Sequence, residues 1–239
     1  MVRPKLAAVG LPPWYPPAFA QLVQDLQVPT EFPPDVTAAA QQAAGADHAT
    51  DAGRADRREI ELVTLDPAGS RDLDQAFAIE RNDQGFRLYY AIADVAAFVE
   101  PGGPIDVEAN RRVETRYAPD RRLPLHPPEL SEGAASLLPG VERPAVLWTL
   151  DLDAAAEIVG IDVARALVKS RAQLAYDAVQ AQIEAGTHDA AIDRLRTLGE
   201  LRLASERTRG AVSLPLPEQV VDVSDDGGWR LTHRLQTPV

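Results

Sequence analysis

A hairpin signal in the middle of this 239-residue chain constrains its fold more than any other feature. Three apolar runs typical of strands occur at 60–65, 76–80 and 86–93. The last two are separated by Asn82–Gly85, a turn sequence with glycine at its end, which predicts a β-hairpin. Two later alternating runs, at 145–152 and 157–168, predict another antiparallel pair. The chain is therefore expected to build a sheet from neighbouring antiparallel strands.

Helices are expected on both sides of the strand region. The first 58 residues are interrupted by prolines and rich in alanine, so they are expected to form a short helical arm with helices at 18–27 and 35–54. Further helices are expected at 105–114, 173–185 and 188–208, and strands at 220–223 and 229–235. The predicted fold class is therefore α/β, with a mixed, largely antiparallel sheet and packed helices in a main domain at 59–239.

The composition limits the compartment and the chemistry. No apolar run approaches the roughly 18 residues that span a bilayer, and the N-terminus has no apolar stretch long enough for a signal peptide. We therefore expect a cytoplasmic protein with no membrane partner. The absence of cysteine excludes disulfides, thiolate metal sites and cysteine nucleophiles. A formal charge of −12 argues against a protein that coats nucleic acid by bulk attraction, although a local basic groove is compatible with it.

Three aspartates follow the first apolar run and form a candidate cation site. Asp66, Asp72 and Asp74 lie within nine residues, in a segment that also contains Pro67 and Gly69. Clustered carboxylates repel one another unless a cation or a basic partner neutralises them, and Mg²⁺ accepts a few such ligands while keeping waters. The spacing of Asp72 and Asp74 points both side chains to one side of an extended segment. A solvated surface turn is the commoner meaning of such a string, so the neighbouring motifs have to decide.

Basic residues gather in two places that suit phosphate. Tyr117 is flanked by five arginines, Arg111, Arg112, Arg116, Arg121 and Arg122, and a later group contains Arg165, Lys169, Arg171 and Tyr176. Arginine forks bind phosphate oxygens and tyrosine rings stack on bases, a combination that holds single strands with little sequence preference. The competing interpretation is that the arginines pair with acidic neighbours such as Glu114 and that Tyr117 is a core residue.

A series of motifs gives the acidic and basic sites a common interpretation. The motifs lie at 64–74, 92–99, 117–131, 136–145, 168–179 and 209–218. In order and spacing, this set resembles the catalytic domain of the ribonuclease II, or RNB, exoribonuclease family. The resemblance covers about residues 59–235, and the motifs are highly specific as a set.

The resemblance implies a processive hydrolase that degrades single-stranded RNA from its 3′ end to nucleoside 5′-monophosphates, with Mg²⁺ as cofactor and Mn²⁺ as the alternative ion. Asp66, Asp72 and Asp74 match the metal-site aspartates of the family, and Tyr117 matches a tyrosine that stacks on the RNA. The other residues expected at the RNA are Arg116, Arg121, Arg171, Tyr176 and Arg209. The residues suit this chemistry, because metal ions held by carboxylates neutralise a phosphodiester and lower the pKa of a bound water.

Two departures from the family pattern affect this interpretation. Family members commonly have a second aspartate directly after the position of Asp74, whereas this chain has Gln75, a neutral and weaker Mg²⁺ ligand. The family's catalytic domain also continues past the position of Val239 and supplies an arginine there, and residues 1–58 lack the aromatic strands of an RNA-binding β-barrel. The chain is therefore expected to be a fragment, or a shortened member whose site a partner chain completes.

Two other functions are compatible with these residues. One is an RNA-binding or regulatory protein that keeps the fold without turnover, because Gln75 and the missing region leave the site incomplete. The other is a DxD-type metal enzyme acting on a nucleotide sugar, which Asp72 and Asp74 permit. Asp94 is expected to be buried and to cap the following turn, with support of the metal site as the lesser alternative. His126 is assigned no role.

Overall fold

The computed structural model describes residues 9–10, 15–48, 53–118, 121–212, 216–223 and 228–234. They form two compact units that interleave along the chain. The first unit draws on the described residues within 1–33, 109–125 and 213–238, and the second on those within 34–108 and 126–212. Among all the described residues, no helix is long and apolar enough to cross a membrane. The expected division into an arm at 1–58 and a domain at 59–239 stays a prediction.

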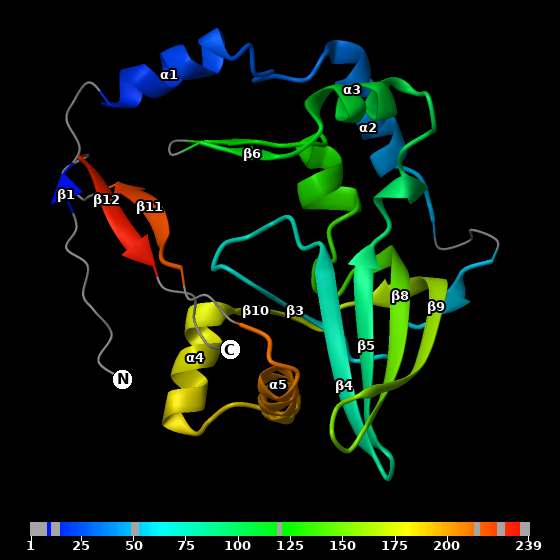
Figure 1. Cartoon of the computed structure of the whole chain (residues 1–239). Coiled ribbons are helices and arrows are strands. Elements are labelled where there is room, and N and C mark those ends of the chain that lie inside the picture. Colours follow the sequence, from blue (N-terminus) through cyan, green and yellow to red (C-terminus); the bar gives the residue numbers. More distant parts are fainter. Residues whose placement is uncertain are drawn as a thin grey trace. The chain divides into compact units, whose positions relative to one another are not determined.

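A seven-stranded sheet forms the centre of the second unit, with strand order β10-β3-β4-β5-β8-β9-β2 (Figure 1). Its strands are β2 (Ala55–Asp56), β3 (Val63–Asp66), β4 (Gln75–Asn82), β5 (Gly85–Ala93), β8 (Glu142–Asp153), β9 (Ile158–Lys169) and β10 (Ala172–Ala175). The β10–β3 and β2–β9 pairs are parallel, and the other pairs are antiparallel. The mixed, largely antiparallel sheet predicted from the sequence is therefore confirmed.

The hairpin between β4 and β5 has the predicted turn. The Asn82 side-chain oxygen accepts hydrogen bonds from the backbone N–H groups of Gln84 and Gly85, both at 2.9 Å. Gly85 has a φ of 146°, and a Cβ there would collide with the backbone of Leu152 and Asp153 in the neighbouring strand β8. Only glycine fits at this position. The turn thus sets the register that runs from Asn82 opposite Gly85 to Gln75 opposite Ile92.

Each face of the sheet carries its own apolar core, as the alternation of side chains along a strand requires. One core contains Leu62, Leu73, Ala91, Leu147 and Val168. The other contains Val63, Phe77, Phe86, Leu152 and, from helix α5 (Ala190–Thr208), Leu198. The segment that carries the aspartates is therefore anchored by apolar residues on both faces: Val63 on one and Leu73 on the other.

The remaining helices are α1 (Tyr15–Asp25), α2 (Pro34–Ala44), α3 (Pro104–Arg112) and α4 (Tyr176–Ala185), with a 3₁₀ turn η1 (Val95–Ala97) and a π-helical turn η2 (Leu130–Ala134). The prediction of a helix over 35–54 is wrong in length, because α2 ends before Gly45 and residues 55–56 pair with β9 as strand β2. Residues 49–52 lie outside the described part.

The helix expected at 173–185 starts too early. Residues 172–175 form β10 instead, in parallel register with β3 from Ala172 opposite Val63 to Ala175 opposite Asp66. A sheet partner satisfies the backbone groups that a helix would satisfy internally, and local periodicity does not reveal that partner. The helix expected at 188–208 begins at Ala190, because the Asp189 carboxylate accepts hydrogen bonds from the N–H groups of Ala191 and Ile192.

The first unit contains two small sheets. One has the order β1-β12-β11, from β1 (Val9–Gly10), β11 (Glu218–Val223) and β12 (Trp229–Arg234), and the other pairs β6 (Arg116–Tyr117) with β7 (Arg122–Leu123). The strands predicted at 220–223 and 229–235 are confirmed, although Leu235 lies outside the described residues. The two-residue strands were not expected, since segments this short carry no periodic signal.

Candidate metal and RNA site

The three aspartates lie where β3 gives way to β4. Asp66 is the last residue of β3, and the loop of residues 67–74 leads to Gln75, the first residue of β4. Gly69 has a φ of 84°, and the Ser70 N–H donates to the Pro67 carbonyl at 3.2 Å, so the loop turns sharply after the strand. The Gln173 side chain of β10 donates to the Ser70 carbonyl at 2.8 Å. The loop is thus held against the β10 edge of the sheet.

The carboxylates influence one another electrostatically. The pKa of Asp66 is raised above its ordinary value, first by burial and then by the negative charges of Asp74 and Asp72. The Asp66 Oδ2 atom is buried and has no hydrogen-bond partner in the described residues. The ionised form of Asp66 is therefore disfavoured until a positive charge neutralises the cluster.

A hard cation fits this arrangement by charge. A buried carboxylate oxygen without a partner, beside two further carboxylates, is the kind of group that Mg²⁺ or Mn²⁺ accepts as a ligand. Within the described part of the chain, no three His, Asp or Glu side chains are already gathered tightly enough to hold an ion. The carboxylate oxygens of Asp66, Asp72 and Asp74 are therefore suitable ligands for such a cation. Binding of all three to one ion requires their side chains to move.

Gln75 is engaged by a tyrosine that the sequence did not single out. The Tyr90 hydroxyl donates a hydrogen bond to Gln75 Oε1. The pKa of Tyr90 is raised by burial, with smaller effects from Tyr176 and Asp66, so these side chains belong to one neighbourhood. Tyr90 lies opposite Phe77 in the hairpin, on the same face as Gln75 and Ile92. Only this register could have indicated its place at the site.

The residues expected to bind RNA around Tyr117 lie in the first unit. Tyr117 is 76% exposed in β6, so the alternative that it anchors a core is wrong. Arg116 and Arg121 are also exposed, and the Arg116 Nε atom lies 3.9 Å from a Glu114 carboxylate oxygen. Such an exposed pair is weak and leaves the guanidinium able to exchange partners.

Arg171, Tyr176 and Arg209 belong to the second unit. Arg171 pairs with Asp189, the capping residue of α5, at 3.3 Å, and Arg209 lies exposed directly after that helix. Tyr176 begins α4 and is the member of this group that influences the pKa of Tyr90.

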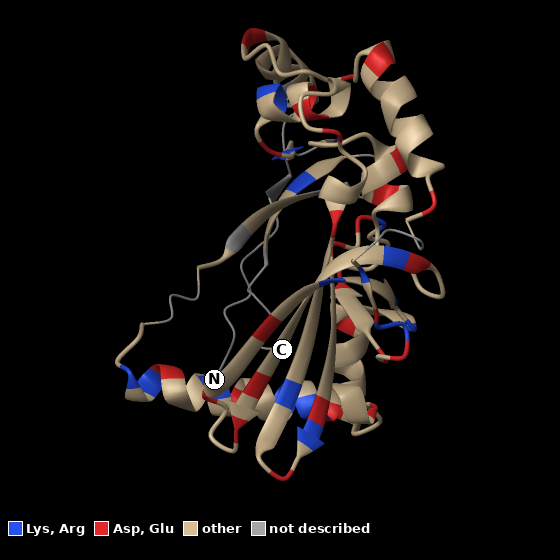
Figure 2. Cartoon of the chain, turned by 90° about the vertical axis from the view of Figure 1, so that its right-hand side faces the viewer, with Lys and Arg blue, Asp and Glu red and all other residues tan. Residues whose placement is uncertain are grey.

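Figure 2 shows acidic and basic segments interspersed along the sheet strands. Arg87 and Asp151 are one such cross-strand pair, at 2.7 Å.

Asp94 is buried as expected, but the prediction that it caps the following turn is wrong. Its side chain makes no capping hydrogen bond to η1. It forms ion pairs instead with two arginines, Arg54 at 2.9 Å and Arg165 at 3.0 Å, and Arg165 also donates hydrogen bonds to it. A buried carboxylate favours cationic partners because they offset its desolvation.

His126, to which the sequence assigned no role, is half-buried, and burial lowers its pKa.

The model of the RNB domain family matches residues 54–236. The chain belongs to the RNB family. The match covers the aspartate loop, the Tyr117 segment and the Arg171 segment, so all the predicted site residues lie inside the RNB domain. Recognition of this family from the sequence motifs is therefore confirmed.

Named relatives and solved structures agree with this membership. Ribonuclease R of Acidithiobacillus ferrooxidans is 35% identical over 199 residues, which cover 80% of this chain and 45% of that protein. The structure of Mycoplasma genitalium RNase R in complex with double-stranded RNA superposes with a TM-score of 0.83 at 26% identity, over 92% of this chain and 41% of that one. This RNB chain thus spans less than half the length of these two relatives.

A second solved structure shares the fold alone. Yeast Ssd1, described as a pseudonuclease, matches 65% of this chain with a TM-score of 0.59 and 18% identity. The RNB fold by itself therefore does not establish turnover, and the residues of the site have to carry the functional argument.

Proposed function

We propose that this chain carries the metal-binding part of a 3′-to-5′ exoribonuclease that hydrolyses single-stranded RNA to nucleoside 5′-monophosphates. The observation that supports this most directly is the buried, unpartnered oxygen of Asp66, beside the charges of Asp72 and Asp74, within an RNB domain. Relatives named Ribonuclease R and Exoribonuclease 2 support the same reaction class. The direction of degradation and the products follow from the family resemblance.

In this proposal Asp66, Asp72 and Asp74 hold Mg²⁺, or Mn²⁺ in its place. An ion held there would neutralise charge on the phosphodiester and lower the pKa of a water molecule that attacks it. The protein's own part is to carry Asp72 and Asp74 on the loop that joins the end of β3, where Asp66 lies, to β4. The positive charge of the ion would then favour the ionised form of Asp66. Gln75 contributes a neutral amide, whose oxygen is engaged by the Tyr90 hydroxyl.

RNA contacts are proposed for the two tyrosines and their neighbouring arginines. The exposed ring of Tyr117 offers a stacking surface for a base, and Arg116 and Arg121 offer guanidinium groups for phosphates. Tyr176, which neighbours Tyr90, suits a nucleotide close to the aspartates. Because the chain spans 45% of Ribonuclease R of Acidithiobacillus ferrooxidans, we propose that a further region or a partner chain completes the RNA channel. The proposed compartment of the protein is the cytoplasm.

The test is the shortening of a 5′-labelled single-stranded oligoribonucleotide in the presence of Mg²⁺. We expect a ladder of products that shortens from the 3′ end, and we expect Asp74→Asn to abolish it because one anionic ligand is lost. Asp83→Asn, in the exposed turn of the hairpin, is the matched control and should retain activity. Unchanged shortening by Asp74→Asn would contradict the role of the aspartates, and intact RNA with the wild-type protein would show that this chain does not cut RNA by itself.

A second candidate is an RNA-binding protein without turnover. The observation that favours it is the neutral Gln75, tied to Tyr90 at a position where the family commonly has an aspartate. Retention of labelled RNA without shortening, in Mg²⁺ and in Mn²⁺, would support this alternative. The nucleotide-sugar alternative is not carried forward, because the chain belongs to the RNB family.

A further inference from the structure

Ser136 and the residue after it make three hydrogen bonds to the aspartate loop from a distant point in the sequence. Ser136 is 1% exposed, and it follows Leu73 by 63 residues in the sequence. The Ser136 hydroxyl donates to the Arg71 carbonyl at 2.6 Å and accepts from the Leu73 N–H at 3.0 Å. The next residue, Leu137, donates its N–H to the Leu73 carbonyl at 2.9 Å.

These hydrogen bonds hold the loop on both sides of Asp72. The peptide before it is fixed through the Arg71 carbonyl, and the peptide after it through both polar groups of Leu73. Leu73 is fully buried in the core on one face of the sheet, so its side chain adds an apolar anchor. Asp74 follows directly, and its own carbonyl accepts from the Ala93 N–H at 2.9 Å. The backbone that carries two of the three carboxylates is thus pinned.

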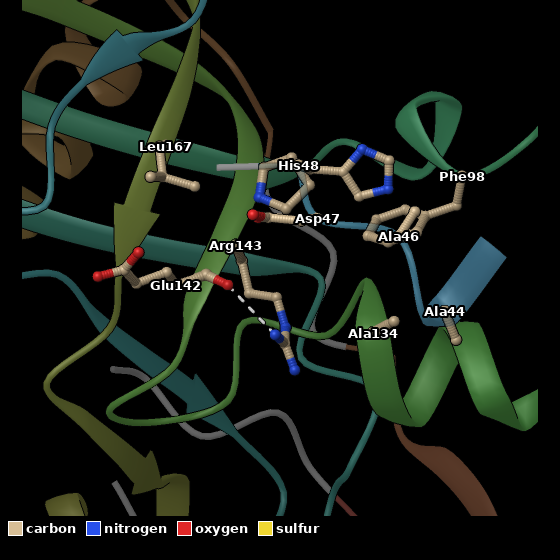
Figure 3. Close-up of a pocket in the computed structure, with 10 residues that line it drawn as sticks. Ala44, Ala46, Asp47, His48, Phe98, Ala134, Glu142, Arg143 and Leu167 are labelled. Atoms are coloured by element: carbon tan, nitrogen blue, oxygen red, sulfur yellow. Dashed lines mark hydrogen bonds between the residues drawn. The ribbon is translucent and has the colours of Figure 1, made fainter. Parts of the chain in front are cut away.

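Ser136 is itself held by Arg143 from the start of β8. The Arg143 guanidinium donates to the Ser136 carbonyl at 3.0 Å and to the Gly133 carbonyl, at the end of η2, at 3.1 Å. Figure 3 shows Arg143 beside Ala134 of η2, among the residues that line a cavity of about 170 Å³. Burial lowers the pKa of Arg143, because removing the charged guanidinium from water is unfavourable. Its carbonyl partners offset that cost.

We propose that Ser136 is a positioning residue for the metal site, whose hydroxyl sets the backbone of residues 71–73 so that Asp72 and Asp74 face Asp66. This role rests on the proposed function of the three aspartates. Ser136 lies on a loop that follows η2, and π-helical turns recur near functional sites. Because Ser136 acts through the backbone, it makes no contact with substrate or metal in this proposal.

Loss of the hydroxyl should loosen the loop and weaken ion binding. Ser136→Ala removes the partner of the buried Leu73 N–H and of the Arg71 carbonyl, and unmade buried hydrogen bonds are unfavourable. The carboxylates then have to be ordered when the ion binds. We expect Mn²⁺ affinity to fall by roughly 10-fold or more, the size of effect that residues behind a metal ligand commonly have.

Ser170→Ala is the matched control. Ser170 is 2% exposed, and its hydroxyl lies 3.2 Å from the Ala172 carbonyl oxygen and 3.4 Å from the Leu62 carbonyl oxygen. The Ser170→Ala substitution therefore also removes a buried hydroxyl, but it removes no contact to the aspartate loop. Ser136→Cys fills nearly the same space with a weakly hydrogen-bonding group and keeps the test available if the alanine variant does not fold.

The experiment combines amide hydrogen exchange at Leu73 with Mn²⁺ binding by calorimetry, for the wild type and the three variants. We expect faster Leu73 exchange and weaker Mn²⁺ binding for Ser136→Ala and Ser136→Cys, and wild-type behaviour for Ser170→Ala. Unchanged exchange or unchanged affinity in the Ser136 variants would overturn the positioning role while the metal site stands. A wild type that binds no Mn²⁺ would remove the metal site itself, and the role of Ser136 with it.

Discussion

Gln75 is the neutral side chain at the end of the aspartate loop. It follows Asp74 directly, and its amide oxygen accepts from the Tyr90 hydroxyl. An amide adds no charge to the three carboxylates, whereas an aspartate at this position would add a fourth. Burial, and then the negative charges of Asp74 and Asp72, raise the pKa of Asp66. A fourth carboxylate would add to this repulsion, which favours binding of a cation and disfavours the metal-free fold.

Gln75→Asp tests this directly. We expect its Mn²⁺ affinity to rise roughly tenfold, because ligand charge tunes the affinity of hard-cation sites over several decades. We also expect its melting temperature without metal to fall. Gln84→Asp, at the opposite end of the hairpin, makes the same change in charge away from the site and should alter neither quantity. Calorimetric titration and thermal unfolding provide both readouts, and unchanged affinity for Gln75→Asp would show that position 75 does not reach the ion.

At the scale of elements, the segment from β10 to α5 connects the site to the helices. β10 lies beside β3 in parallel register and brings Tyr176 to the end of the strand that carries Asp66. Helix α5 packs Leu198 into the core on one face of the sheet, so the sheet and this helix stabilise each other. The start of α5 depends on Asp189, which caps the helix and also pairs with Arg171.

Asp189→Ala should lower the free energy of unfolding by about 1 kcal/mol, the usual cost of losing an N-terminal cap. Asp189→Asn keeps an oxygen that accepts the capping hydrogen bonds but loses the charge that pairs with Arg171. Because that ion pair is exposed, Asp189→Asn should retain most of the stability. Urea unfolding of the two variants separates the effects, and equal losses would mean that the charge matters more than the cap.

At the scale of the whole sheet, Asp94 joins segments that are distant in sequence. It directly follows β5 and pairs with Arg54, which precedes β2, and with Arg165, which lies in β9. Arg54 is only 3% exposed, so its charge depends on protein partners in place of water. The ion pair therefore holds the β2 edge of the sheet to its centre.

Asp94→Ala should destabilise the protein by about 3 kcal/mol or more, because it removes the carboxylate that a buried arginine faces. Arg165→Ala removes the exposed partner of the same carboxylate and should cost about 1 kcal/mol or less. Denaturant unfolding monitored by tryptophan fluorescence measures both. Similar losses for the two variants would show that Arg54 does not depend on Asp94.

The sequence by itself determined the antiparallel hairpins, most of the helices, the aspartate loop and membership of the RNB family. These depend on periodicity, turn residues and motifs that are read along the chain. Tertiary structure alone decided that residues 172–175 pair with β3, that Asp94 binds two arginines in place of a turn, that Tyr90 reaches Gln75 and that Ser136 holds Leu73. In each of these cases a backbone or buried polar group is satisfied by a partner distant in sequence, and local patterning carries no information about which partner folding brings to it.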